Sequence, residues 1–368
     1  MKYKIISVVG ARPNFMKVAP LSRAFDASDK FEHLIVHTGQ HYDKNMSDAF
    51  FEDLDMPQPR HFLNVGSGTH SQQTANIMIE FEKILDIENP DMVIVVGDVN
   101  STIACALTAV KKNIKVAHVE AGLRSFDKSM PEEINRLATD AISDYAFVSE
   151  PSGIYHLKRE SFPEQNTFFV GNNMIDSQYY GLEKLQIRND ILELIPNEEY
   201  ALVTIHRPSN VDFENQLKML VNLLNEYSSR IKMIFPVHPR TEKNLEKFGL
   251  KDIIFNNPNI TTYEPLSYLK FLAFMKNAKV IITDSGGIQE ESTALQVPCI
   301  TLRNTTERPI TVEIGTNELI IPKEDLIRDA IERVLSGRFK SGKIPELWDG
   351  KASIRTRDII FNLLENRI

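Results

Sequence analysis

Cysteine is scarce in this chain of 368 residues, where only Cys105 and Cys299 occur. They stand far apart and each lies within an apolar segment, so we expect buried free thiols rather than a disulfide or a zinc site. A chain that uses no disulfide suits a reducing compartment, and we therefore expect a cytoplasmic protein.

Long hydrophobic runs are also missing, because none approaches the roughly 20 residues needed to cross a bilayer. The N-terminal segment MKYKIISVVG passes directly into a Gly-Ala-Arg-Pro turn. It lacks the long apolar core of a signal peptide and is expected to form a first core strand.

A surplus of positive charge is absent too. The formal net charge of -8 gives no general attraction to nucleic acid or to an anionic membrane surface, so an anionic ligand would need individual Arg or Lys side chains. There is no P-loop motif, and the glycines of NVGSGTH do not complete G-x-G-x-x-G because Ser71 takes the last place. A bound dinucleotide is not indicated.

What is present is a regular series of short Val- and Ile-rich runs, separated by amphipathic stretches. This pattern predicts β-α units that feed a parallel sheet, an α/β fold. A composition of 42% hydrophobic and 25% charged residues is typical of a soluble globular protein. The expected strands are 4–9, 33–37, 92–96, 115–119, 145–149, 167–170, 201–205, 232–237, 279–283, 298–302 and 318–321.

The length of the chain suggests two domains, at about 100 to 200 residues for each. A polar segment at 188–200 interrupts the series and marks the boundary. We expect an N-terminal Rossmann-like domain at 1–185, a C-terminal Rossmann-like domain at 186–350, and a last helix at 351–368 that could pack on either half. Two such halves make a cleft.

Polar residues follow many of these runs, where parallel sheets bind their ligands. In the first half they are Arg12 and Lys17 in GARPNFMK, Asp98 in GDVNST and Glu120 in HVEAG. In the second half the corresponding segments are HRPSN, HPRT, DSGG and RNTTERP. The recurrence of these residues is the functional signal.

Several of these residues also have a purely structural interpretation. Asp98 could cap the helix that follows it, and Glu132 and Glu133, which follow a proline, could serve a helix dipole. His206 and His238 could be hydrogen-bonded core histidines.

The segment DSGGIQEES is harder to explain structurally. Ser285, Gly286 and Gly287 form a strand-to-helix turn whose N–H groups point outward and suit an anion. Glu291 lies one turn into the helix, where a carboxylate suits a ribose diol. The implied ligand is a nucleotide.

In order, these motifs resemble the non-hydrolysing UDP-N-acetylglucosamine 2-epimerases, a family with two Rossmann-like domains that face a cleft, as in GT-B glycosyltransferases. The resemblance runs from GARPNFMKVAPL through HTGQHYD, GDVNST, HVEAGLRS, MPEEINR, TIHRPSN, PVHPRT and DSGGIQEE to TTERP and VEIGTN, and covers most of the chain.

The resemblance implies roles for particular residues. The catalytic residues would be Asp98, Glu120, Glu132 and His206, and the substrate-binding residues would be Arg12, Lys17, Phe271, Ser285, Gly286, Gly287, Glu291 and Arg308. Glu133 is assigned to the helix start. The loop RSFDKSM at 124–130 would border the sugar and influence which sugar is accepted.

The resemblance further implies a homodimer that needs neither cofactor nor metal. It would interconvert UDP-GlcNAc and UDP-ManNAc for surface polysaccharide synthesis, by elimination of UDP to 2-acetamidoglucal and re-addition. Alternatives are epimerisation of UDP-2,3-diacetamido-glucuronic acid, a GT-B glycosyltransferase, a hydrolysing epimerase and a nucleotide-sugar sensor.

Some residues depart from the family pattern. Asn14 and Ser209 replace glutamates, and Leu266 stands where some members have Gln. Members activated by their own substrate carry Q-H-R-x where this chain has QHYD at 40–43, so such activation is not expected.

Overall fold

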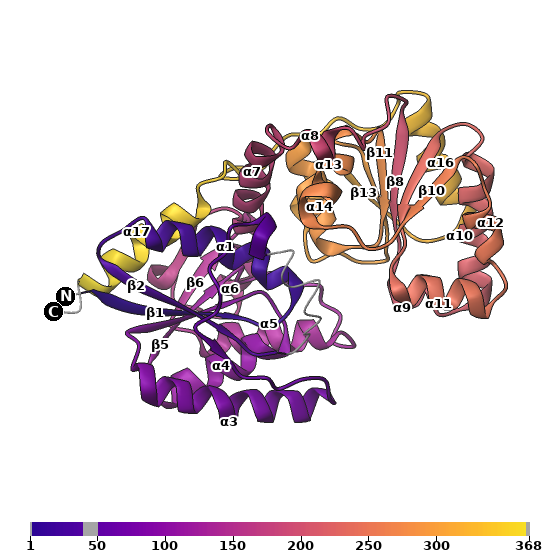
Figure 1. The fold of residues 1–368 in the computed structure, drawn as a ribbon. Coiled ribbons are helices and arrows are strands. Elements are labelled where there is room, and N and C mark those ends of the chain that lie inside the picture. Colours follow the sequence, from indigo (N-terminus) through magenta and orange to yellow (C-terminus); the bar gives the residue numbers. More distant parts are fainter. Residues whose placement is uncertain (1, 40–50, 366–368) are drawn as a thin grey trace. The chain divides into compact units, whose positions relative to one another are not determined.

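The computed structural model of the protein describes residues 2–39 and 51–365 (Figure 1). The chain forms two compact units, the first from Met1–Tyr180 with Glu346–Ile368 and the second from Gly181–Pro345. The sequence placed these boundaries at 185/186 and 350/351. The first boundary of the structure falls inside helix α7 (Asn173–Leu185), a continuous helix that has no polar linker at that point.

The first unit is built on a parallel sheet with the strand order β3-β2-β1-β4-β5-β6-β7. Its strands are β1 (Tyr3–Val9), β2 (Phe31–His37), β3 (His61–Phe62), β4 (Met92–Val96), β5 (Lys115–Val119), β6 (Tyr145–Val148) and β7 (Thr167–Phe169). Its described helices include α1 (Arg12–Asp26), α3 (His70–Glu88), α4 (Asn100–Lys111), α5 (Pro131–Ile142), α6 (Pro151–Arg159) and α17 (Ala352–Glu365). A 3₁₀ turn, η1, spans Glu164–Asn166.

Helices cover both faces of this sheet, which is why its strands are apolar on both sides. Ile6, Val8, Val93 and Val95 pack with apolar residues of α3 and α4. The opposite face carries α1 and α17 (Figure 1). Helix α17 is fastened to α1 by a hydrogen bond of 3.1 Å from Arg357 Nη1 to the carbonyl of Ala24.

The second unit repeats this plan with the parallel strand order β10-β9-β8-β11-β12-β13. Its strands are β8 (Tyr200–Thr204), β9 (Lys232–Pro236), β10 (Ile260–Tyr263), β11 (Val280–Thr283), β12 (Cys299–Leu302) and β13 (Asn317–Ile320). Its helices are α8 (Asn189–Leu192), α9 (Pro208–Val211), α10 (Glu214–Tyr227), α11 (Pro239–Lys247), α12 (Lys251–Phe255), α13 (Tyr268–Asn277), α14 (Gly286–Leu295), α15 (Pro309–Glu313) and α16 (Glu324–Leu335).

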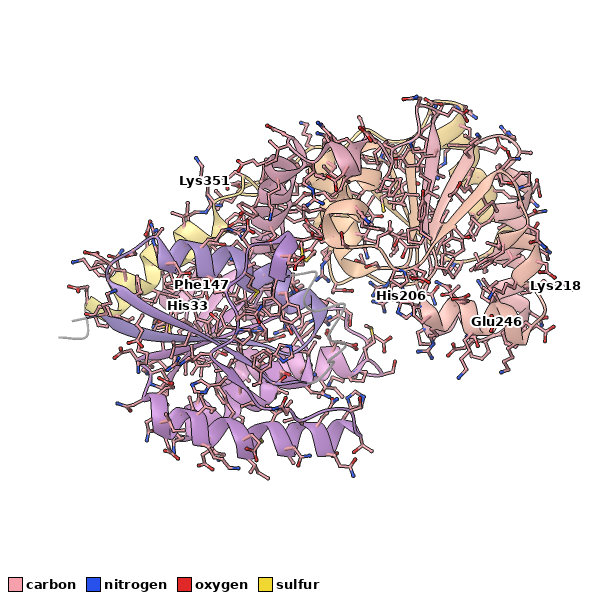
Figure 2. All side chains as sticks on the ribbon, viewed as in Figure 1. His33, Phe147, His206, Lys218, Glu246 and Lys351 are labelled. Atoms are coloured by element: carbon pink, nitrogen blue, oxygen red, sulfur yellow. The ribbon has the colours of Figure 1, made fainter. Side chains whose placement is uncertain are left out.

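The core of the second unit joins α10 and α16 to the sheet. Leu220 and Leu224 of α10 and Ile331 of α16 pack in one cluster with the residues of β8, β9, β11 and β12. Charged residues such as Lys218 and Glu246 point outward from the helices (Figure 2). The unit therefore has its own hydrophobic core.

The α/β architecture with two parallel sheets is confirmed, and each expected strand is present with ends within one or two residues of those expected. Two strands were missed, β3 and β10. Both lie at a sheet edge, and β10 is only partly buried, so neither has the continuous apolar run of a central strand.

Within residues 2–39 and 51–365, no helix is both long and apolar enough to cross a membrane.

Candidate active site

A buried ion pair lies at the carboxyl edge of the sheet in the first unit. Lys17 Nζ of α1 is 2.6 Å from Glu120 Oε2, and the two side chains are 4% and 6% exposed. Glu120 directly follows β5 and has a φ of 72°, a backbone conformation that is costly for a residue other than glycine. Gly97 makes room for the lysine, since a Cβ there would lie 2.8 Å from Lys17 Nζ.

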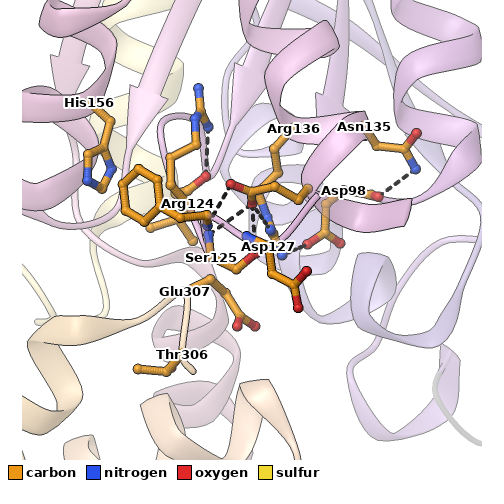
Figure 3. A network of polar contacts seen from close by, with 12 residues as sticks. Asp98, Arg124, Ser125, Asp127, Asn135, Arg136, His156, Thr306 and Glu307 are labelled. Carbon is orange, nitrogen blue, oxygen red and sulfur yellow. Dashed lines mark hydrogen bonds and ion pairs between the residues drawn. The ribbon is translucent and has the colours of Figure 1, made fainter. Parts of the chain in front are cut away.

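Asp98 follows β4 and lies at the same edge of the sheet. Its Oδ2 is 2.7 Å from Arg136 Nη2, and its carbonyl oxygen accepts a hydrogen bond of 2.9 Å from Asn135 Nδ2 (Figure 3). The N-cap of α4 is Val99, and no side chain caps this helix. The helix-cap interpretation of Asp98 is therefore wrong, and its carboxylate, 22% exposed, remains accessible to a ligand.

Glu132 and Glu133 are neighbours in the first turn of α5 but have different surroundings. Glu132 is exposed, and no described residue pairs with its carboxylate. Glu133 is 1% exposed and accepts hydrogen bonds from the backbone N–H groups of Ser125 and Phe126, both 2.9 Å long. Its Oε2 also lies 2.5 Å from Arg136 Nη1.

The contacts of Glu133 exceed those of a residue that only serves a helix dipole. Burial tends to raise the pKa of its carboxyl group, but the two backbone hydrogen bonds and Arg136 outweigh burial and lower that pKa. Glu133 therefore stays ionised and ties the loop 124–130 to α5. Arg136 joins this buried carboxylate to Asp98 (Figure 3).

The turn after β1 is organised by Asn14, one of the departures from the family pattern. Its Oδ1 accepts hydrogen bonds from the N–H groups of Gly10 (3.1 Å) and Ala11 (2.9 Å), and its Nδ2 donates to Val96 O at 3.0 Å. The asparagine thus links the ends of β1 and β4. Arg12 begins α1, and its side chain lies outside the described part of the chain, as do residues 40–43 of HTGQHYD.

In the second unit, Asp284 fixes the segment that carries His206. Asp284 is fully buried after β11, and its carboxylate accepts hydrogen bonds from the backbone N–H groups of His206 and Arg207. His206 Nδ1 lies 3.1 Å from Asp284 Oδ1. This contact orients the imidazole at the end of β8, where its side chain is 35% exposed.

Neighbouring groups stabilise the negative charge of Asp284. Burial tends to raise the pKa of this carboxyl group, but the hydrogen bonds from His206, Arg207 and Asn210 outweigh burial and lower the pKa. The ring of His238 lies beside His206, with centroids 5.2 Å apart. His238 caps α11 by accepting a hydrogen bond from the N–H of Arg240, but it is exposed, so its interpretation as a core histidine is wrong.

Ser285, Gly286 and Gly287 form the turn from β11 into α14, as the motif predicts. A Cβ on Gly286 would lie 2.9 Å from Glu307 Oε1 and 3.4 Å from Arg308 Nη1. Glycine is therefore needed for the close approach of these side chains to the N-terminus of α14.

Arg308 belongs to a buried cluster of charges in this unit. Its Nε lies 2.8 Å from Glu290 Oε2 and its Nη1 lies 2.5 Å from Glu307 Oε1. Glu307 also pairs with Arg303 Nη2 at 2.9 Å. The carboxylates hold the guanidinium group of Arg308 in a defined orientation.

Glu291 is buried in α14 and accepts a hydrogen bond of 3.0 Å from the hydroxyl of Tyr268 in α13. Burial raises the pKa of Glu291 to about 8, the hydrogen bond from Tyr268 opposes this rise, and the charge of Glu290 adds to it. Phe271 lies one turn further along α13 and is half-buried.

Sequence reasoning missed the partners that orient the candidate residues. Arg136 and Asp284 stand in motifs that were recognised, PEEINR and DSGG, yet their contacts with Asp98 and His206 join segments far apart in the chain. Their positions in the sequence could have indicated this role. Asp284 directly follows a strand, and Arg136 lies one helical turn beyond the candidate acid Glu132.

Across the described residues, no group of three or more His, Cys, Asp or Glu side chains is arranged to hold a metal ion. Both cysteines are free and buried.

Comparisons with known proteins agree with the resemblance. A family model described as UDP-N-acetylglucosamine 2-epimerase matches residues 23–361. The chain belongs to this family of isomerases. A UDP-N-acetylglucosamine 2-epimerase of Methanocaldococcus jannaschii is 45% identical over 357 residues, which cover 93% of this chain and 97% of that protein.

A second relative and a solved structure extend the comparison. The UDP-2,3-diacetamido-2,3-dideoxy-D-glucuronate 2-epimerase of Pseudomonas aeruginosa is 38% identical over 343 residues, which cover 92% of this chain and 93% of that protein. The crystal structure of the M. jannaschii UDP-GlcNAc 2-epimerase in complex with UDP-GlcNAc and UDP has a TM-score of 0.90 at 42% identity, covering 98% of this chain and 99% of that one.

Proposed function

We propose that the protein interconverts UDP-GlcNAc and UDP-ManNAc by inverting carbon 2 of the sugar. The observation that carries this proposal is the group of acids at one sheet edge of the first unit, where Glu120 is paired with Lys17 and Asp98 with Arg136. Paired carboxylates suit proton transfer near an anionic substrate, because their cations reduce the repulsion.

The chemistry explains the need for several acids. The hydrogen on C2 is adjacent to no carbonyl group, so its simple removal and return would be slow. Elimination avoids this difficulty: a base takes the proton from C2, a C1–C2 double bond forms, and the C1–O bond breaks so that its electron pair leaves with UDP. A proton then returns to C2 from the opposite face while UDP adds back to C1.

We assign the proton transfers to the carboxylates of Asp98, Glu120 and Glu132. The exposed Glu132 is accessible to a substrate, and Glu120 and Asp98 are held in place by Lys17 and Arg136. An acid and a base are needed on opposite faces of the sugar, and three carboxylates are enough for both and for stabilising an oxocarbenium-like transition state.

We assign the binding of uridine diphosphate to the second unit. The N-terminus of α14 at Ser285, Gly286 and Gly287 suits a phosphate, and Glu291 suits the ribose hydroxyls. His206 is oriented by Asp284 and would stabilise the departing diphosphate.

Further binding roles follow the same assignment. Arg308, oriented by two carboxylates, would bind the diphosphate together with His206, while Phe271 would contact the uracil. Such an elimination needs neither cofactor nor metal. We further propose a homodimer that works in the reducing cytoplasm, where free buried thiols persist, and that serves surface polysaccharide synthesis.

A second candidate substrate is UDP-2,3-diacetamido-glucuronic acid, because the Pseudomonas relative named for this sugar aligns over nearly the whole chain. The two sugars differ at C3 and C6, and the second carries a carboxylate. In the loop 124–130, Arg124 is already paired with Glu160, whereas Lys128 is exposed. Lys128 could therefore bind the carboxylate of the second sugar.

Incubation with UDP-GlcNAc in D2O, followed by NMR, tests the function. We expect UDP-ManNAc with deuterium at C2, since the proton that returns comes from solvent. Free ManNAc would instead indicate a hydrolysing enzyme. Transfer of the sugar to an added acceptor would indicate a glycosyltransferase.

The same incubation with UDP-2,3-diacetamido-glucuronic acid decides between the two substrates by their kcat/KM values. Binding of both sugars without deuterium at C2 of either would refute the epimerase and indicate a sensor. The variant Glu246→Gln, at an exposed position of α11 in the second unit, is the control that should retain full activity.

A further inference from the structure

His118 is a fully buried histidine in β5, two residues before Glu120. Its Nε2 lies 2.8 Å from the carbonyl oxygen of Gly97, and its Nδ1 lies 2.6 Å from Asp140 Oδ1 in α5. Both ring nitrogens are therefore within hydrogen-bond distance of an oxygen atom. The identity of the two oxygens decides where the protons are.

The Gly97 oxygen is a backbone carbonyl, which can only accept, so Nε2 must carry a proton. Asp140 can donate only if it is protonated, and its other contacts argue against this. Its Oδ2 accepts a hydrogen bond of 3.0 Å from Gly122 N and lies 2.7 Å from Arg124 Nη2.

The balance of effects on Asp140 supports the same conclusion. Burial tends to raise the pKa of its carboxyl group, but His118 and Arg124 outweigh burial and lower the pKa. Asp140 is thus a carboxylate that accepts at both oxygens, and His118 Nδ1 must carry a proton as well.

The positive charge of an imidazolium at this position is balanced by neighbouring charged groups. Asp140 of α5 faces it directly, and Arg124 of the loop is shared between Asp140 and Glu160 of the segment after α6. This group contains two cations and two anions. Buried charges are tolerated when they are paired and hydrogen-bonded in this way.

The contact with Gly97 bears on Asp98 because a peptide group is planar. The carbonyl of Gly97 and the nitrogen of Asp98 belong to one such group. The hydrogen bond from His118 to this carbonyl therefore fixes the orientation of the peptide group that leads into Asp98. Asn135 holds the next carbonyl, that of Asp98 itself, and Arg136 holds the carboxylate. Asp98 is therefore held on both sides of its backbone and at its side chain.

We propose that His118 is a positioning residue with a proton on both ring nitrogens, an imidazolium that Asp140 holds in place and that fixes Asp98 through the Gly97 carbonyl. The protonation state rests on the hydrogen-bond geometry of the ring and on the charges around Asp140, and it does not depend on the proposed function. The effect on catalysis rests on the proposed function of Asp98.

The chain contains a control for this inference in His33 of β2, a histidine that is only partly buried (Figure 2). Its Nε2 lies 2.8 Å from Ser7 Oγ, and no described group bonds to its buried Nδ1. Burial lowers the pKa of His33 to about 3, so this ring should stay neutral where His118 is charged.

NMR of the protein labelled with ¹⁵N-histidine, recorded at neutral pH, tests the protonation state. We expect both ring nitrogens of His118 to carry protons, while His33 shows one unprotonated nitrogen. The signal that disappears in His118→Asn assigns the resonance. An unprotonated nitrogen in His118 at neutral pH would overturn the proposal.

Two substitutions each retain one of the two hydrogen bonds that the ring of His118 makes. The amide nitrogen of His118→Asn can replace Nδ1 and donate to Asp140, whereas that of His118→Gln can replace Nε2 and donate to Gly97. If His118 positions Asp98 through Gly97, kcat should fall roughly 10- to 100-fold in His118→Asn and distinctly less in His118→Gln, with KM and UDP affinity unchanged in both.

Full activity of a folded His118→Asn, or a loss in Gln equal to that in Asn, would refute the positioning role. The NMR measurement needs no substrate, so failure of the proposed epimerase activity would leave the protonation result intact.

Discussion

Replacement of Glu132 and Glu133 by glutamine, one at a time, should separate catalysis from stability. Glu133→Gln should lower the stability of the first unit, whereas Glu132→Gln should lower kcat and leave the stability unchanged. Glu133 is buried and binds Ser125, Phe126 and Arg136, so Glu133→Gln leaves the guanidinium group of Arg136 with one anionic partner fewer. Removal of one partner from a buried pair costs about 3 kcal/mol, at the lower end of the usual range because the glutamine keeps one oxygen.

This loss can be assigned to one unit because Trp348 is the only tryptophan of the chain. It is buried in the first unit, where its Nε1 donates to Ser149 O at 3.0 Å. Tryptophan fluorescence therefore reports the unfolding of that unit. For a unit of about 200 residues, 3 kcal/mol corresponds to a fall in Tm of about 6 to 12 °C.

Glu132→Gln should leave the same transition within about 0.5 kcal/mol of the unchanged protein, since the residue is exposed. Its kcat should fall at least about 100-fold, the usual scale for a positioned acid or base, with UDP binding retained. Near-normal turnover would remove Glu132 from the mechanism, and an unchanged Tm in Glu133→Gln would refute the structural role of that carboxylate.

The pH dependence provides a further check on Glu133. Its pKa is lowered in the folded protein, so its contribution to stability is fully present above the unfolded value of about 4.3 and disappears as the pH falls through the folded value. The difference in unfolding free energy between the unchanged protein and Glu133→Gln should thus be constant near neutral pH and shrink in acid. A difference that grows in acid would contradict this sign.

Three other substitutions test the two units. Lys17→Met should lower kcat/KM roughly 100-fold or more because it removes the cation that contacts the buried Glu120 at 2.6 Å, and a normal value would refute that pairing role. Glu291 has a raised pKa of about 8, so the stability of the second unit should fall as pH rises from about 4.5 to 8; Glu291→Gln should flatten this fall in thermal unfolding followed by circular dichroism. Lys128→Ala should lower kcat/KM about fivefold for UDP-2,3-diacetamido-glucuronic acid but not for UDP-GlcNAc, and equal effects would exclude a contact with the sugar carboxylate.

The central strands and the positions of the candidate residues were predictable from the sequence, because both depend on local signals. A strand buried on both faces leaves a continuous apolar run such as MVIVV at 92–96, and the residue after it must lie at the carboxyl edge of a parallel sheet. The short edge strands β3 and β10 give no such signal.

The contacts that hold the candidate residues were not predictable, since each joins segments distant in the chain. Arg136 reaches Asp98 across 38 positions, and the backbone N–H of His206 reaches Asp284 across 78. Spacing alone could not show that Glu133 binds a loop while Glu132, its neighbour, faces solvent.

Helix α5 shows why periodicity fails at this site. Its Ile134 is 55% exposed, whereas Glu133, Arg136 and Asp140 are each no more than 3% exposed, so the buried face is the charged one. Buried ion pairs contribute little net stability compared with apolar packing of similar volume. A helix that buries three charges is therefore better explained by what they orient, and two of them lead directly to Asp98 and His118. The rule that apolar residues mark the buried face fails where the protein needs fixed charges.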